Sequence, residues 1–218
     1  MMIDPWYILL GAIIVFSTTT LLRLRSRERQ RREAYAEYCL IRGFRYEPQQ
    51  AEGELRFRDV FEEFRRGDED SWRHSITGTR NGAIFTAFEY VWKTGGGKAV
   101  HFRSGVIWES DAVSFPRFEL TPEGWLTRLG EVFGMQDIDF TDSAEFSKAY
   151  RLEGPDEASV RSLFIPQIRQ FFAATPGQHV TGGGRFLIWW FASLLPSAQS
   201  LDEWLEQGDH VRRRFFKQ

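Results

Sequence analysis

The sequence predicts an α+β fold in which one N-terminal transmembrane helix precedes a cytoplasmic domain with an antiparallel β-meander and packed helices. Three observations lead to this expectation. Residues 6–22 contain no charged side chain and are followed by a run of arginines. Apolar and polar residues alternate around Asn81-Gly82, a strong signal for a two-residue β-hairpin. The second half alternates helical and extended patterns, as α+β domains do.

The N-terminal apolar stretch, continued to Leu24, has about 19 residues and would span roughly 28 Å as a helix, close to the thickness of a bilayer's hydrocarbon core. Asp4 stands where a cleavable signal peptide carries basic residues, so we expect a retained anchor at residues 1–24. The arginines that follow should stay in the cytoplasm, with the N-terminus outside. Residues 25–43 are then a juxtamembrane helix, and residues 44–218 a cytoplasmic domain.

Charge is distributed unevenly along a chain whose formal net charge is −2. The first 32 residues contain six arginines and two acidic residues, which leaves 22 basic and 28 acidic residues in the remainder. An acidic domain does not attract phosphate backbones, so we expect no nucleic-acid partner. The arginines either serve only as a topological flank or also bind anionic lipid. The possible lipid-facing residues are Arg23, Arg25, Arg27, Arg29, Arg31 and Arg32.

Composition predicts one well-filled core in the domain. The chain has 218 residues with 20 Phe and 8 Trp, whose large side chains bury extensive area. Cys39 is the single cysteine, so an internal disulfide is excluded. We expect Cys39 to be an inert packed thiol, with a reactive or palmitoylated thiol as the alternative.

The secondary structure expected in the first part of the domain is a helical pair followed by the meander. Helices are predicted at residues 26–42 and 55–66, and strands at residues 72–76, 84–93, 99–108 and 115–120. The strand at residues 84–93 is apolar on both sides, which is typical of a central strand. Gly95, Gly96 and Gly97 supply a turn. Thr121 as N-cap and Pro122 after it predict a helix that ends at Gly134.

The last part of the chain mixes short strands with helices. Tyr150 and Leu152 indicate a short strand, and a helix is expected to begin near Asp156. Pro166 either kinks that helix or starts another. A hairpin at residues 182–184 leads into a strand at residues 186–191. Ser200 and Glu203 form a capping-box pattern at the start of the last helix.

No catalytic, cofactor-binding or metal-ligating residue is predicted, and no cofactor is expected. Residues 94–98 resemble a phosphate-binding loop, but Trp92 and Ala99 stand where that motif needs a glycine and a Ser or Thr. No Gly-x-Ser-x-Gly nucleophile elbow occurs. None of the histidines has a partner at a recognised metal-ligand spacing. The sequence therefore favours a protein that is not an enzyme.

Weaker patterns leave alternatives open. Asp137, Asp139 and Asp142 could bind a hard cation, although solvated carboxylates on the wet side of a strand give the same pattern. His74 and His101 lie on strands of one meander and could approach each other. The aromatic residues 189–191 suit burial, or docking on lipid or a partner. The basic residues 212–217 suit a helix terminus or a lipid contact.

The chain resembles a bacterial family of uncharacterised, membrane-anchored proteins of about this size. The residues that carry the resemblance are Phe88-Glu89-Tyr90, Thr94-Gly95, Gly97-Lys98, Phe118-Glu119-Leu120, Pro122-Glu123, Asp137-Ile138-Asp139-Phe140, Phe146, Tyr150-Arg151-Leu152, Gly154, Val160-Arg161 and Leu163-Phe164. The resemblance implies a bacterial origin, and with the predicted topology a place in the inner membrane. The family has no assigned activity, so no site is transferred.

The leading functional hypothesis is a non-catalytic interaction module, an accessory subunit or scaffold of a membrane-associated complex with a protein partner. The first alternative is an enzyme at the membrane surface that uses Asp137, Asp139 and His101. The second is an anionic-lipid sensor that uses the arginines after the apolar stretch and the basic C-terminal end.

Overall fold

The computed structural model describes residues 5–49, 55–65, 67–124 and 137–216 of the chain. The helices and helical turns are α1 (Pro5–Arg42), α2 (Leu55–Arg58), η1 (Glu62–Arg65), α4 (Ala144–Ala149), α5 (Glu157–Leu163), α6 (Pro166–Ala174), η2 (Ala198–Ser200) and α7 (Leu201–Phe215). The strands are β1 (Arg45–Gln49), β2 (Glu69–Arg80), β3 (Ala83–Thr94), β4 (Ala99–Glu109), β5 (Phe115–Pro122), β6 (Tyr150–Glu153), β7 (His179–Gly184) and β8 (Phe186–Phe191).

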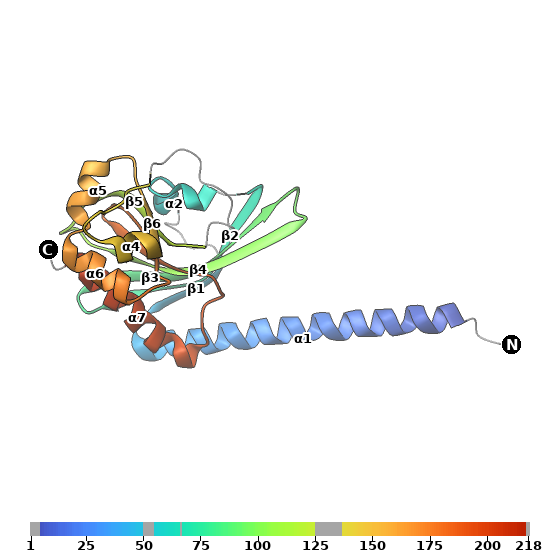
Figure 1. The fold of residues 1–218 in the computed structure, drawn as a ribbon. Coiled ribbons are helices and arrows are strands. Elements are labelled where there is room, and N and C mark those ends of the chain that lie inside the picture. The colour runs from blue at the N-terminus through green and yellow to red at the C-terminus, as the bar shows by residue number, and fades with distance from the viewer. Residues whose placement is uncertain (1–4, 50–54, 66, 125–136, 217–218) are drawn as a thin grey trace.

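The described strands form one antiparallel sheet of eight strands in the order β1-β2-β3-β4-β8-β7-β5-β6. One face packs against α1 and the helices α4 to α7, and the other face packs against α2 and η1 (Figure 1). The first face carries a core that includes Tyr35, Trp108 and Phe172. The second carries an aromatic cluster around Phe64, Trp72 and Phe88. Part of this cluster comes from α2 and η1. The sheet thus separates two apolar cores.

The predicted meander is confirmed. The turn between β2 and β3 is Asn81-Gly82, and both residues have positive φ, 48° and 75°, as this turn requires. Gly95, Gly96 and Gly97 also have positive φ and connect β3 to β4. β3 is buried over most of its length and pairs with β2 and β4, so it is the central strand expected.

Later boundaries were also partly foreseen. Asp156 caps α5 by accepting a hydrogen bond from the backbone N–H of Ser159, and Pro166 starts a separate helix, α6. The expected short strand at Tyr150 is β6, and the expected hairpin joins β7 to β8. These signals succeeded because each is local: a cap, a proline and a glycine-rich turn act within a few residues.

Several expectations were wrong at their boundaries. Thr121 and Pro122 end β5 instead of capping a helix, because Thr121 and Pro122 pair with β6 in the sheet. The helix predicted after them, at residues 125–133, lies outside the described residues. The helix expected at residues 55–66 is broken into α2 and η1. Ser200 makes no side-chain capping hydrogen bond, so the capping box at α7 does not form.

The expected transmembrane span is also corrected. Within the described part of the chain, no helix combines the length and the apolar character needed to cross a bilayer. Hydroxyl residues interrupt the apolar stretch, and Thr18 and Thr19 hydrogen-bond back to helix carbonyls. The prediction of a membrane-spanning helix is therefore wrong for the described residues, and α1 runs unbroken to Arg42.

Close packing of β7 against a buried ring gives a test of this fold. A Cβ at Gly182 would collide with the ring of Phe118, which is 1% exposed and cannot move aside. We predict that Gly182→Ala lowers the free energy of unfolding by about 2–3 kcal/mol. The neighbouring Gly183→Ala, whose Cβ would meet Val60 at 3.0 Å and the ring of Phe61 at 3.4 Å without overlapping either, should cost less than about 1 kcal/mol. Equal losses in chemical denaturation would contradict the pairing of Gly182 with Phe118.

Candidate interaction site at the base of helix α1

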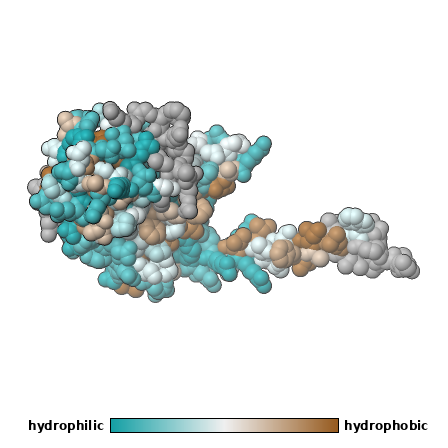
Figure 2. Space-filling view, in the orientation of Figure 1, coloured by the Kyte–Doolittle hydropathy of each residue, from teal (hydrophilic) through white to brown (hydrophobic). Residues whose placement is uncertain are grey.

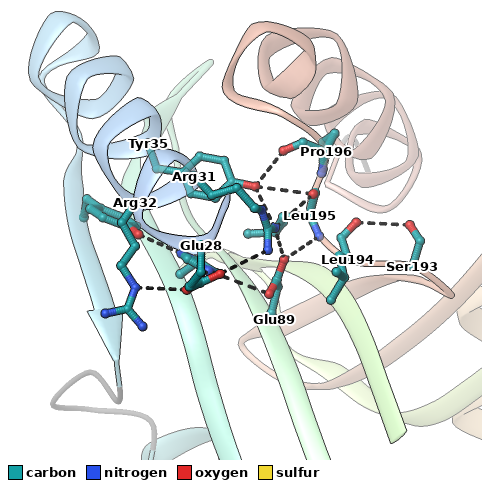
Figure 3. Close-up of polar contacts among 11 residues, drawn as sticks. Glu28, Arg31, Arg32, Tyr35, Glu89, Ser193, Leu194, Leu195 and Pro196 are labelled. Carbon is teal, nitrogen blue, oxygen red and sulfur yellow. Dashed lines mark hydrogen bonds and ion pairs between the residues drawn. The ribbon is translucent and has the colours of Figure 1, made fainter. Parts of the chain in front are cut away.

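Helix α1 is fixed to the domain through one buried carboxylate, that of Glu89 on β3. The Glu89 side chain is 2% exposed and accepts hydrogen bonds from Arg31 of α1 and from the backbone N–H of Leu195, the latter at 2.9 Å. A buried carboxylate without such partners would cost several kcal/mol in desolvation. Glu89 therefore joins three segments that are far apart in the sequence (Figure 3).

Two tyrosines of α1 add hydrogen bonds on the same side of the helix. The Tyr35 hydroxyl donates to the carbonyl oxygen of Pro196 at 2.7 Å, and the Tyr38 hydroxyl donates to Asp202 Oδ1 of α7 at 2.9 Å. Burial raises the pKa of both hydroxyls, which stay protonated and keep donating at neutral pH. The base of α1 is thus held by the loop after β8 and by α7 as well as by the sheet.

His74 completes this polar group from the β2 side. It lies at a bulge of β2 and has φ of 51°, a left-handed conformation that is uncommon for a residue with a side chain. Its Nδ1 is 2.7 Å from the hydroxyl of Tyr46, and its Nε2 is 3.2 Å from Glu28 Oε1, without hydrogen-bond geometry. Burial lowers the pKa of His74, while the carboxylates of Glu89 and Glu28 oppose that shift. The imidazole is therefore neutral at pH 7.

We name this group the α1 junction; it consists of Glu28, Arg31, Arg32, Tyr35, His74 and Glu89. Its carboxylates and guanidinium groups are paired with one another: Arg32 Nε donates to Glu28 Oε1 at 2.9 Å. The open hollow beside it, about 360 Å³, lies between Gln30 of α1 and Ser197 and is lined mainly by apolar atoms. The arrangement is suited to holding α1 in one direction.

Beyond the junction, α1 leaves the domain and exposes apolar side chains (Figures 1 and 2). Ile13, Ile14, Val15 and Phe16 are consecutive, and each is more than half exposed. Further along the same projecting part, the large apolar side chains with similar exposure are Leu21, Leu22 and Leu24. Arg23, Arg25, Arg27 and Arg29 are exposed among and after them. The projecting part of α1 therefore exposes a set of large apolar side chains that is followed by exposed arginines.

The opposite face of the sheet holds a second buried polar group. His179 Nε2 lies 2.9 Å from Glu119 Oε1, and the guanidinium carbon of Arg103 lies 3.5 Å from the ring centre of Trp190. Burial raises the pKa of Glu63, and the nearby carboxylate of Glu119 raises it further. In the described part of the chain, no three His, Cys, Asp or Glu side chains are placed to hold a metal ion.

The residues proposed for a surface enzyme are not brought together. His101 lies at the β3–β4 hairpin, where it stacks on Trp92 and its Nε2 is 3.0 Å from the hydroxyl of Thr94. Asp137 and Asp139 are exposed near β6, which β8, β7 and β5 separate from β4. Asp142 is paired with Arg169 at 2.6 Å. His74 does not approach His101, because His74 contacts Tyr46 at the α1 side of the sheet and His101 stacks on Trp92 in the β3–β4 hairpin.

Other sequence candidates are distributed between surface and core. Of the possible lipid-facing arginines, Arg31 and Arg32 are engaged by Glu89 and Glu28, and the others are exposed. Cys39 is 1% exposed, and burial raises the pKa of its thiol to about 11, as an inert thiol requires. Trp189 and Trp190 are buried. At the basic C-terminal end, Arg212 pairs with Asp209 and the Phe215 ring is fully buried; residues 217–218 lie outside the described part.

Sequence reasoning overlooked the key residue of the site. Glu89 interrupts a strand of large apolar residues that is covered on both faces, and a charge in such a strand must have a buried partner. That signal predicts an ion pair but leaves the partner open, because it does not show that Arg31 lies above β3.

No family model matches the chain, and neither the curated proteins nor the solved structures include one with detectable similarity to it.

The Arg31–Glu89 pair gives a test of how α1 is held. Arg31→Met removes the charged partner of a carboxylate that is 2% exposed, so we predict a loss of about 2–3 kcal/mol in the free energy of unfolding. Arg29→Met is the matched control, because among the described residues Arg29 pairs with the exposed Glu33, and its loss should leave the free energy of unfolding nearly unchanged. Chemical denaturation of both variants checks this. Similar losses would show that Glu89 is not the anchor.

The lowered pKa of His74 predicts a pH dependence of stability. In the unfolded chain the imidazole of His74 binds a proton near pH 6.5, whereas in the folded state it does so only at lower pH. The stability that neutral His74 contributes to the folded state is therefore fully present above pH 6.5 and is lost on acidification. We predict that the wild type loses more unfolding free energy between pH 7 and 5 than His74→Asn does, by at most about 1.4 kcal/mol per pH unit. Asn is chosen because it tolerates positive φ. Parallel curves from denaturation at several pH values would rule out the predicted linkage.

Proposed function

We propose that the chain is a non-catalytic interaction module, an accessory subunit or scaffold, that docks to a protein partner through the projecting part of α1. The observation that carries this proposal is the set of large apolar side chains that α1 exposes beyond the junction. Monomeric proteins rarely expose apolar surface on this scale, and where they do it marks an interaction site.

The pattern of exposure indicates that the partner surrounds the helix. Successive residues of an α-helix point about 100° apart, so Ile13, Ile14, Val15 and Phe16 together cover almost the whole circumference. A helix that is apolar on every side is stable where it is buried on every side. Burial of each such side chain contributes about 1.5–3 kcal/mol.

The arginines next to the exposed apolar side chains of α1 favour a different protein, and not a second copy of this chain, as the partner. A parallel bundle of several α1 helices would bring the exposed Arg23, Arg25 and Arg27 of each copy close together, and like charges at short distance repel. A partner with an apolar groove and carboxylates at its rim would match both parts of the helix. We therefore propose an acidic-rimmed groove between helices of another protein.

The α1 junction supports docking by fixing the helix before the partner arrives. Arg31, Tyr35 and Tyr38 bind three different segments of the domain, so the base of α1 cannot change direction without breaking partly buried hydrogen bonds. A binding element that already has its bound conformation loses less entropy on association. The surface enzyme, in contrast, gains no support, because Asp137, Asp139 and His101 lie apart.

The proposal predicts that partner capture depends on the projecting half of α1. Phe16→Asn combined with Leu22→Asn should reduce the partner recovered with the tagged chain by at least about tenfold, because two large apolar contacts are lost. The control is Leu40→Asn with Ile41→Asn, which makes the same chemical change at exposed positions of α1 near the domain. Quantitative mass spectrometry after gentle extraction measures recovery.

Two results would contradict the proposal. The wild-type chain could migrate as a lone monomer under every gentle extraction condition, with α1 covered only by lipid or detergent. Alternatively, both double variants could recover the same partner in the same amount, which would place the docking surface elsewhere on the chain.

A further inference from the structure

A second projecting element lies on the same side of the domain as α1. β3 and β4 extend past the end of β8, which pairs with β4 only from Ser104 onward, and in Figure 1 their hairpin points to the same side as the free part of α1. Its turn contains Gly95, Gly96 and Gly97 with the exposed Lys98. Nothing in the proposed docking of α1 accounts for this extension.

The hairpin carries an exposed apolar patch on one of its faces. Val100 and Phe102 are 59% and 50% exposed, and alternation along β4 places them on the same face as Ser104. Ser104 pairs with Glu89 on one side and with Phe191, 40% exposed, on the other. Val100, Phe102 and Phe191, which we name the hairpin patch, therefore share the sheet face on which α1 is anchored.

The other face of the same hairpin is covered by stacked aromatic rings. Trp92 is 5% exposed and stacks between Tyr90 and His101. A hairpin with one aromatic face packed and the other bare is built to meet a surface outside the domain.

Charges around the patch favour an anionic surface. Two acidic groups lie next to the hairpin: Glu69 pairs with Lys93 at 2.6 Å, and Asp68 accepts a hydrogen bond from the backbone N–H of Gly96 but keeps its charge. Lys98 is exposed at the turn, and the exposed Arg23, Arg25, Arg27 and Arg29 lie on the projecting α1. Each arginine near an anionic lipid surface contributes about 1 kcal/mol.

We propose that the hairpin patch lies against an anionic phospholipid surface, with Val100 and Phe102 at the headgroup boundary and the cations of the turn and of α1 near the phosphates. The size of the patch favours lipid over protein. A stable protein interface buries about 800 Å² on each partner, which a patch of three side chains does not supply. Shallow insertion of a few apolar side chains combined with electrostatic attraction is sufficient for a lipid surface. This contact goes beyond the proposed function, because the hairpin patch takes no part in the docking of α1, and only the arginines of α1 are common to the two contacts.

The test places a fluorescent probe on the hairpin of the full-length chain. Val100→Cys introduces a thiol at the patch, and Ile84→Cys introduces one at the opposite end of β3, where Ile84 is 47% exposed. The native Cys39 is buried and does not compete for the label. Each labelled chain is mixed with vesicles of phosphatidylcholine, with or without roughly 30% phosphatidylserine, that carry a headgroup-proximal spin-labelled quencher.

The proposal expects a blue shift and quenching of the label at position 100 with phosphatidylserine vesicles, a weaker response without phosphatidylserine, and no response at position 84. Adding Phe102→Ser to the chain labelled at position 100 should weaken the quenching. Vesicle binding with neither label quenched would overturn the hairpin contact and leave the docking of α1 intact. A blue shift at position 100 without quenching, seen only with a bound protein, would assign the patch to a protein partner and overturn the lipid proposal.

Discussion

The carboxylate of Glu89 is the constraint on which the arrangement of the chain depends. It is buried in the central strand, where desolvation would be costly without compensation, and two distant segments supply the compensation. Arg31 brings α1 onto the sheet, and the backbone N–H of Leu195 brings the loop after β8 to the same oxygen. One buried charge in this way sets where the long helix attaches and where the chain passes from β8 toward α7.

Sequence signals that act within a few residues predicted the structure correctly, whereas pairings between distant segments could not be predicted. The meander could be predicted because Asn81-Gly82 and the glycines after β3 determine their turns locally. The position of β8 beside β4 could not, because that pairing joins strands separated by much of the chain. At Thr121-Pro122 a local helix signal lost to sheet pairing with β6, since ladder hydrogen bonds outweigh the preference of one cap.

The candidate site was less predictable than the fold, and for a related reason. Asp137, Asp139 and His101 attracted attention because residues of chemical interest lie close in sequence or on one meander, but their side chains face solvent or a neighbouring ring. Glu89 and His74 act through partners on other elements. A buried charge in an apolar strand indicates that an oppositely charged partner must lie nearby, and only the packing of α1 identifies that partner as Arg31.

Hydrogen bonds with fixed geometry determine the orientation in which α1 packs on the apolar face of this domain. Apolar burial is non-directional, so Tyr35 and Cys39 alone would let the helix slide or rotate over the sheet at little cost. The hydrogen bonds of Tyr35 to Pro196 and of Tyr38 to Asp202 have fixed geometry and are satisfied in one register only. That register sets the direction in which the rest of α1 leaves the domain. The exposed apolar half of the helix therefore has a defined orientation relative to the hairpin patch, although the residues of α1 from Phe16 to Arg27 are exposed to solvent.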